Sequence, residues 1–292
     1  MSLQSYILSR VSVQHFPDIN KTKKTINQKN NKPKKHINNY HNSILNMQSS
    51  YPKKSYPKCF ISPPFGNYVP TNKNIISIKG SYTLEPRGGL ITQILTTLRY
   101  SYEHGGWRNK IGLRNKGIDY AISQYKKDPS SPAIYSIAIL SPTDIPKILE
   151  KLPDKMNVEL NISCPNTEKN MISDGLKPFL NPTREWCAIK LSPHTPQSQI
   201  DMYYDQGFRQ FHCSNTLPTP RGGVSGSILR KYTNKHIDYI REKYPDAEII
   251  AGGGIQTTDD ACQYLERGAN HIAVSTLLFC PYKAAKFFYN WL

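Results

Sequence analysis

Three polar residues surround one cysteine in a short segment of this 292-residue chain. Cys164 lies between Asn161 and Asn166, beside Ser163, at the end of the apolar run Val158–Ile162. A free cysteine is usually a small buried hydrophobic residue, but three polar neighbours argue against a purely apolar pocket around this one. A thiol held near cationic side chains can act as a thiolate, either as a base or as a nucleophile. The segment is therefore a candidate catalytic site.

Two lysines lie at the ends of other apolar runs. Lys79 follows Ile75–Ile78, and Lys190 lies near the end of Cys187–Leu191. Each lysine alone is typical of a surface side chain whose aliphatic part packs on apolar neighbours. A lysine that points into the mouth of a barrel, however, needs an anionic partner. Both lysines are therefore candidates for contacts with an anionic group.

Glycine and small polar residues follow the later apolar runs. Gly252, Gly253 and Gly254 form one glycine run, and Gly222–Gly226 forms a second one that includes Gly223, Ser225 and Gly226. Such runs leave backbone N–H groups free and allow close approach of a ligand. One run alone is usually a turn, but two at these positions favour a phosphate-bearing ligand if the fold is a barrel.

Eight short apolar runs alternate with helix-like segments after about residue 58. The expected strands are Cys59–Ser62, Ile75–Ile78, Ala133–Leu140, Val158–Ile162, Cys187–Leu191, Gln210–Cys213, Glu248–Ala251 and His271–Val274. The expected helices include Thr143–Lys151, Pro196–Gln206, Arg230–Lys243 and Thr258–Arg267. This alternation predicts an α/β fold, a (β/α)8 TIM barrel over residues 58–292, whose usual size is roughly 250 residues. An open doubly wound sheet is the alternative.

Residues 1–57 have a different composition. Residues 1–60 carry 11 Lys or Arg and one acid, so residues 61–292 account for only +7 of the total charge of +17. The first segment has little apolar periodicity and predicts a disordered basic tail. Such a tail could bind nucleic acid, a membrane surface or an acidic partner. Sparse aromatic residues among the basic ones favour a solvated tail instead, and we do not expect nucleic acid as a partner.

Cysteine spacing and hydropathy exclude several classes of protein. The six cysteines are Cys59, Cys164, Cys187, Cys213, Cys262 and Cys280. None forms a CxxC pair or has a histidine at zinc-ligand spacing, so we expect no metal site. Scattered single cysteines are typical of reduced thiols and favour a cytoplasmic location. No run approaches the roughly 18 apolar residues of a membrane span.

Several motifs together resemble the dihydroorotate dehydrogenase family over about residues 59–292. They are IKGSYTLEPR, NKIGLRNKGIDY, ELNISCPN, IKLSP, SNT, GGVSG and AGGGI, in the family's order. The combination of ELNISCPN with GGVSG and GGI is specific, whereas each motif alone is not. A cysteine at position 164 and the lack of an apolar anchor resemble the class-one enzymes of that family, which are often dimers.

The resemblance implies an FMN-dependent oxidation of dihydroorotate, a step of pyrimidine biosynthesis. Cys164 would remove the C5 proton, and the C6 hydride would pass to N5 of FMN. Lys79 and Lys190 would contact the flavin, with Lys190 stabilising negative charge on the reduced ring. The implied substrate ligands are Asn109, Asn161, Asn166, Asn215 and Thr216. The implied FMN ligands are Ser62, Gly66, Gly223, Ser225, Gly226, Gly253, Gly254, Ser275 and Thr276, and Asn161 is implied for both.

Two alternatives stay open. A tRNA-dihydrouridine synthase is another FMN barrel with an Asn and Cys-Pro motif, but it usually has glycine where this chain has Ser163. It would also carry aromatic or arginine stacking platforms for RNA. The second alternative is a degenerate flavin-binding barrel without turnover, which the short spacing from Phe65 to Lys79 and the segment TEKNMISDG favour. Retention of Cys164 and both lysines argues against it.

Overall fold

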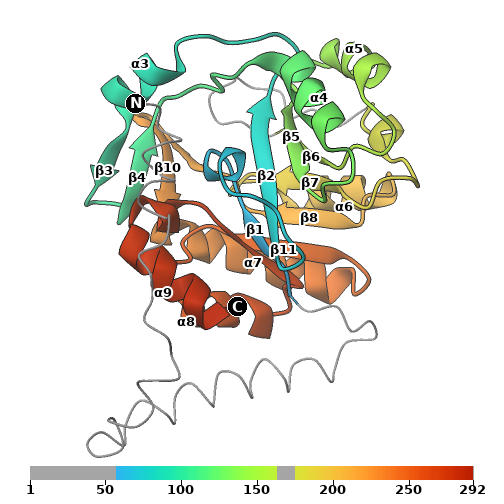
Figure 1. Cartoon of the computed structure of the whole chain (residues 1–292). Coiled ribbons are helices and arrows are strands. Elements are labelled where there is room, and N and C mark those ends of the chain that lie inside the picture. Colours follow the sequence, from blue (N-terminus) through green and yellow to red (C-terminus); the bar gives the residue numbers. More distant parts are fainter. Residues whose placement is uncertain (1–56, 163–174, 292) are drawn as a thin grey trace, which may run out of the picture. The chain divides into compact units, whose positions relative to one another are not determined.

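The structure is a computed structural model, and it describes residues 57–162 and 175–291. Eight parallel strands form a closed barrel in the order β1-β12-β11-β8-β7-β6-β5-β2 (Figure 1). These strands are β1 (Cys59–Ile61), β2 (Ile75–Tyr82), β5 (Ile134–Ala138), β6 (Val158–Asn161), β7 (Cys187–Leu191), β8 (Gln210–Cys213), β11 (Glu248–Gly252) and β12 (His271–Val274). Each predicted strand coincides with one barrel strand, so the predicted (β/α)8 barrel is confirmed and the open sheet is wrong.

Helices cover the outside of the barrel (Figure 1). They are α4 (Gly117–Lys127), α5 (Asp144–Lys151), α6 (Gln197–Asp205), α7 (Arg230–Lys243), α8 (Thr258–Glu266) and α9 (Pro281–Trp291). Helix α3 (Leu90–Thr97) instead lies beside the segment Gly106–Asn109 and has no buried residue. Helices α5 to α8 match the four predicted ones. The connection from β1 to β2 contains only the 3-10 turn η2 (Phe65–Asn67), in agreement with its short sequence.

Helix α8 shows how the sequence sets an element boundary. The Thr257 side chain accepts a hydrogen bond from the Asp260 N–H at 3.2 Å, and the Asp260 carboxylate accepts one from the Thr257 N–H at 3.0 Å. This reciprocal pair satisfies N–H groups that the first turn would leave free. The helix ends before Gly268, whose φ of +110° suits glycine. Thr257, Asp260 and Gly268 therefore set the two ends of this helix.

A second, antiparallel sheet was not predicted. It consists of β3 (Arg99–Ser101), β4 (Gly106–Asn109), β9 (Leu217–Thr219) and β10 (Gly222–Gly226) in the order β3-β4-β10-β9. The glycine run that we expected to be a donor-rich loop is thus strand β10. An added Cβ at Gly106 would collide with the Ser225 carbonyl of β10, so glycine permits the close pairing of β4 with β10.

The barrel interior changes from apolar to polar along the strands. The apolar part is one buried cluster: Phe60, Ile76, Ile78, Ile134, Trp186, Ile250 and Ala273. Because strand residues two apart share a face, Ser136 points to the same side as Ile134 but lies closer to the carboxyl end of β5. Polar and charged side chains therefore begin toward the end of the barrel where function is usually found in this fold.

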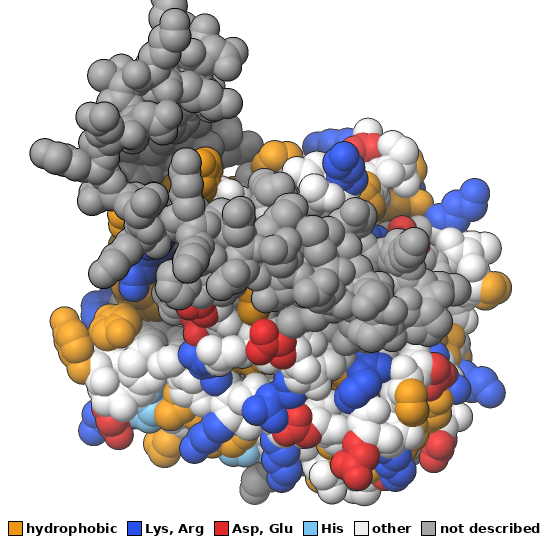
Figure 2. Space-filling view, turned by 90° about the horizontal axis from the view of Figure 1, so that it is seen from below, with side chains coloured by type: hydrophobic (Ala, Val, Ile, Leu, Met, Phe, Trp, Pro, Cys, Tyr) orange, Lys and Arg blue, Asp and Glu red, His pale blue; other side chains and the backbone are white. Residues whose placement is uncertain are grey.

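The outer surface bears charges of both signs. On the face that Figure 2 shows, the lysine and arginine side chains are interspersed with aspartate and glutamate side chains. That mixture does not resemble the single basic stripe that nucleic-acid binding needs. In residues 57–162 and 175–291, no helix combines the length and the apolar character that crossing a membrane requires.

Candidate functional site

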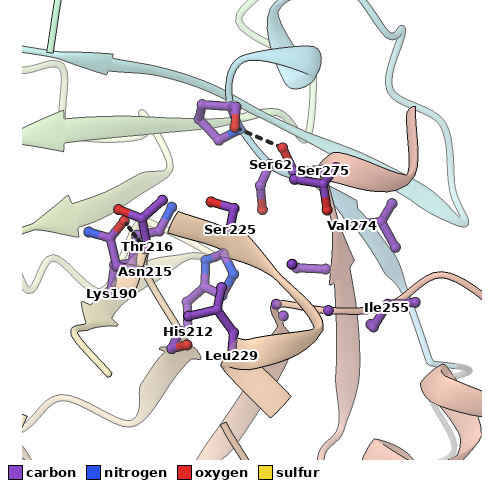
Figure 3. A pocket seen from close by; sticks show the side chains of 18 residues that line it. Ser62, Lys190, His212, Asn215, Thr216, Ser225, Leu229, Ile255, Val274 and Ser275 are labelled. Atoms are coloured by element: carbon purple, nitrogen blue, oxygen red, sulfur yellow. Dashed lines mark hydrogen bonds between the residues drawn. The ribbon is translucent and has the colours of Figure 1, made fainter. Parts of the chain in front are cut away.

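A pocket opens at the carboxyl ends of β1, β8, β11 and β12, next to β10. It encloses about 550 Å³ of space, part of which is open to solvent. The predicted residues that line it are Ser62, Lys190, Asn215, Thr216, Ser225, Gly226, Gly253, Gly254, Ser275 and Thr276. Figure 3 shows the hydroxyl groups of Ser62, Ser225 and Ser275 around the pocket, with Lys190 and Asn215 farther along it.

Two glycines after β11 form a cradle for an anion. Gly253 and Gly254 both have left-handed φ angles, +91° and +82°. A Cβ on Gly253 would lie 2.8 Å from the Leu229 Cβ, so a side chain would fill the cradle. Within the described residues, the N–H groups of these two glycines form no hydrogen bond. Successive free N–H groups of this kind bind phosphate and carboxylate groups.

Glu159 lies at the inner end of the pocket and was not predicted as a site residue. Its side chain is 1% exposed, and its carboxylate accepts a hydrogen bond from Ser136 at 2.7 Å. It also lies 3.3 Å from the Lys190 ammonium and 2.5 Å from Nδ1 of His212. Burial alone would raise the pKa of Glu159, but Lys190, His212 and the hydrogen bonds from His212 and Ser136 outweigh it and lower this pKa to about 2. The carboxylate is therefore ionised.

A chain of hydrogen bonds links this carboxylate to the predicted substrate residues. Ser136 is 2.8 Å from Ser81 (hydroxyl to hydroxyl), and the Asn161 amide donates to Ser81 at 3.0 Å. The Asn215 amide donates to the Asn161 side-chain oxygen, also at 3.0 Å. Asn161 is 4% exposed and does not line the pocket, so its contact is with Asn215, which does. The network fixes which way the Asn215 amide points.

Lys79 is not part of this pocket. Its neighbour Ile78 belongs to the interior cluster, so Lys79 points to the outer face of the barrel. There its ammonium lies over the Tyr135 ring, 5.5 Å from the centroid, and Tyr135 packs against Tyr125 of α4. Burial lowers the pKa of Lys79, and Asp128 opposes that change. The predicted flavin contact of Lys79 is therefore corrected, and we leave this residue out of the proposed site.

Three other predicted ligands also lie away from the lining of the pocket. Gly66 packs against the backbone of β1 and β2, where an added Cβ would collide with the Ile78 carbonyl. Gly223 is in the middle of β10 and pairs with Asn109 of β4. The Asn109 side chain accepts a hydrogen bond from the Ile111 N–H at 3.2 Å. These residues shape the sheet beside the pocket.

Cys164 and Asn166, the predicted base and one predicted substrate ligand, lie outside the described residues. The predicted tail, residues 1–57, also lies outside them apart from Pro57.

Two functional candidates were missed because each is one charged or polar residue inside an apolar strand. Glu159 lies in the run VELNI, and His212 lies in QFHC. Alternation with period two was the available signal, since it places both side chains on the inner face of a closed barrel. A buried carboxylate there requires a cation and hydrogen-bond donors, which Lys190 and His212 provide.

The architecture defines a (β/α)8-barrel protein with an anion cradle after its last two strands and a charged group at the inner end of its pocket. The sequence model of the family "Dihydroorotate dehydrogenase" matches residues 207–288, the part that builds the cradle. A catalytic subunit of dihydroorotate dehydrogenase B (NAD(+)) from Listeria monocytogenes is 26% identical over 253 residues, covering 74% of this chain and 81% of the relative. The corresponding Shouchella clausii subunit is 28% identical over 278 residues, covering 82% and 88%.

A solved structure has the same fold. The ligand-free type DHODH from Eimeria tenella superimposes with a TM-score of 0.63 at 16% identity and covers 87% of this chain and 93% of its own. The family match and the bacterial relatives both support a protein of the dihydroorotate dehydrogenase family, and the solved structure shows the same barrel fold.

Proposed function

We propose that the chain oxidises dihydroorotate to orotate with FMN as its cofactor. The observation that carries this proposal is one pocket that joins the cradle of Gly253 and Gly254 to the cation Lys190. The cradle suits a phosphate, and the lysine suits a group that gains negative charge during the reaction. The two relatives described above match this chain over four fifths or more of their length, and both are named catalytic subunits of dihydroorotate dehydrogenase B (NAD(+)).

The residues present fit FMN. Free N–H groups of Gly253 and Gly254, with the hydroxyl groups of Ser225 and Thr276, offer donors to a phosphate at one end of the pocket. The Ser275 hydroxyl already donates to the Pro63 carbonyl at 3.1 Å, which holds the loop after β12 against the loop after β1. When bound, FMN would supply a hydride acceptor that no side chain can provide.

The amide side chains would hold the substrate. Asn215 and Thr216 line the pocket, and the Thr216 N–H donates to the Asn215 side-chain oxygen at 2.9 Å. Asn161 orients Asn215 through the bond described above. Asparagine both donates and accepts, which suits a ring that carries two amides and a carboxylate. We propose that Asn166 adds a further amide and that Cys164 removes the C5 proton.

The proposal is tested by the visible spectrum of the purified chain before and after anaerobic addition of dihydroorotate. We expect flavin bands that bleach with dihydroorotate, and that hardly change in Cys164→Ala. Cys262→Ala is the matched control, because Cys262 is a buried cysteine on α8, away from the pocket. It should bleach as the unchanged chain does.

Other outcomes separate the alternatives. A protein that keeps its flavin but does not bleach contradicts dihydroorotate as substrate and favours another pyrimidine or a barrel without turnover. A colourless protein that takes up no added FMN contradicts the cofactor as well. Bleaching that persists fully in Cys164→Ala contradicts the role of that thiol alone.

The assembly and location expected from the sequence belong to the same proposal. We propose a homodimer in the cytoplasm, with a small pyrimidine as the substrate. Light scattering during gel filtration should give twice the mass of one chain. The mass of a single chain would contradict the dimer and leave the proposed reaction unaffected.

A further inference from the structure

His212 is a pocket residue whose two ring nitrogens have different surroundings. Nδ1 lies 2.5 Å from a carboxylate oxygen of Glu159, and the His212 side chain is 2% exposed. A carboxylate only accepts hydrogen bonds, and Glu159 is ionised, so Nδ1 carries the proton. The second nitrogen, Nε2, is therefore free to accept a proton or to carry one.

Nε2 faces the pocket. A Cβ built on Gly252, which lines the pocket, would lie 3.0 Å from Nε2. None of residues 57–162 or 175–291 forms a hydrogen bond with Nε2. In Figure 3 the His212 ring lies within the pocket, beneath Ser225. A buried imidazole held at one nitrogen by a carboxylate and open at the other is arranged to exchange protons with a ligand.

The charges around His212 decide when it takes up a proton. Among residues 57–162 and 175–291, the titratable groups that face it are Glu159 on β6 and Lys190 on β7, while the neighbouring strand β11 contributes Gly252. Burial lowers the pKa of His212, the Glu159 carboxylate opposes that change, and Lys190 adds to it. With His212 neutral, the charges of Glu159 and Lys190 cancel. A negative charge that arises in the pocket would therefore favour the protonated imidazole.

We propose that His212 is a catalytic residue that takes up one proton at Nε2 when FMN in this pocket is reduced, and that Glu159 is the positioning residue that holds its Nδ1 proton. The inference rests on FMN binding as proposed above. Bound FMN, once reduced by a hydride (two electrons and one proton), would carry one more negative charge than the oxidised ring. The proton for Nε2 would come from a buffer acid in the solvent: its bond to that proton breaks as the N–H bond forms, and its conjugate base stays in solution.

The test measures the reduction potential of the FMN-loaded chain between pH 6 and pH 9. Reduction uses dithionite and a reference dye, so that it does not depend on dihydroorotate. Each proton taken up with two electrons changes the reduction equilibrium tenfold per pH unit, which is about 30 mV. We expect two protons in the unchanged chain, about 60 mV per pH unit, and one in His212→Gln, about 30 mV. His236→Gln is the matched control, because His236 is also buried but bonds to the Ser192 carbonyl away from the pocket.

Equal slopes in the unchanged chain and His212→Gln would overturn the proposal, even if dihydroorotate still bleaches the flavin. Conversely, a flavin that dihydroorotate does not bleach overturns the proposed substrate and leaves the slopes to decide this inference. A chain that takes up no FMN overturns both.

A second measurement does not require FMN. The ¹⁵N shifts of the histidines should show a neutral His212 with its proton on Nδ1 near pH 7, and Glu159→Gln should move that proton toward Nε2. A proton on Nε2 in the unchanged chain, or a doubly protonated ring, would contradict the role of Glu159.

Discussion

Replacement of Glu159 by glutamine should destabilise the fold, and the size of the effect follows from its surroundings. The substitution keeps the shape of the side chain but removes the charge between Lys190 and His212. The pKa of Glu159 is about 2 in the folded chain against an ordinary 4.5. At 1.36 kcal/mol per pKa unit, the folded chain favours the ionised form by about 3 kcal/mol. Loss of one partner from a buried ion pair typically costs about 3 to 5 kcal/mol.

The pH dependence of this loss has a definite sign. A carboxylate whose pKa is lowered by folding stabilises the fold above its unfolded pKa, and this contribution disappears as the pH falls through its folded pKa. The difference in unfolding free energy between the unchanged chain and Glu159→Gln should therefore be about 3 kcal/mol at pH 7. It should shrink as the pH falls from 4.5 to about 2.

Urea unfolding followed by circular dichroism measures the loss of unfolding free energy at pH 7 and its change with pH. The double variant Glu159→Gln with Lys190→Met should lose less unfolding free energy than the sum of the two single variants. Each single variant leaves one buried charge of this pair without its partner, whereas the double variant removes both charges. A coupling of about 1 to 3 kcal/mol is usual for residues in direct contact. A loss below about 1 kcal/mol at pH 7, or losses that simply add, would refute the charged contact inferred here.

Four further predictions test other parts of the structure. Gly254→Ala places a Cβ 2.7 Å from a side-chain atom of α7, at a backbone φ of +82°. Quenching of FMN fluorescence on binding should therefore be lost, and the unfolding free energy should fall by about 1 to 3 kcal/mol. Unchanged quenching would contradict the cradle. Lys79→Met should retain FMN because the side chain lies outside the barrel, whereas Lys190→Met should bind it more weakly in the same titration. Thr257→Ala removes the cap of α8 and should lower the unfolding free energy by about 1 kcal/mol, while Thr258→Ala should have little effect. Folding lowers the pKa of His212, so below pH 6.5 the unfolded chain binds more protons than the folded chain. The unfolding free energy should therefore fall as the pH drops below 6.5, and it should fall less in His212→Gln.

The barrel could be predicted because its strands are encoded locally. Strands that are buried on both faces appear as short continuous apolar runs, and Cys59–Ile61 is an example. The small sheet beside the pocket carries no such signal. Its strands have three to five residues, and Gly222–Gly226 has the composition of a turn. Its pairing with Gly106–Asn109 joins segments more than a hundred residues apart, which local patterns do not reveal.

Lys79 shows that locating a strand does not fix which of its residues face inward. The sequence predicts Lys79 at a strand end, but β2 continues to Tyr82, and Lys79 pairs with Tyr135 inside the ladder. Because side chains alternate along a strand and Ile78 faces the interior, Lys79 lies on the outer face. The apolar run Ile75–Ile78 alone does not reveal which of its alternate residues face inward.

Glu159 and His212 show why charged residues inside predicted strands merit attention in this fold. The eight-stranded barrel is just wide enough for side chains to fill it, so an inward carboxylate cannot reach water and needs a cation and hydrogen-bond donors from other strands. Lys190 supplies the cation and His212 a hydrogen-bond donor, and the two lie opposite each other on adjacent strands. The same arrangement places both side chains at the lining of the pocket. A contact that the fold requires is therefore also the source of the site's charge, and a substitution at Glu159 should alter stability and cofactor chemistry together.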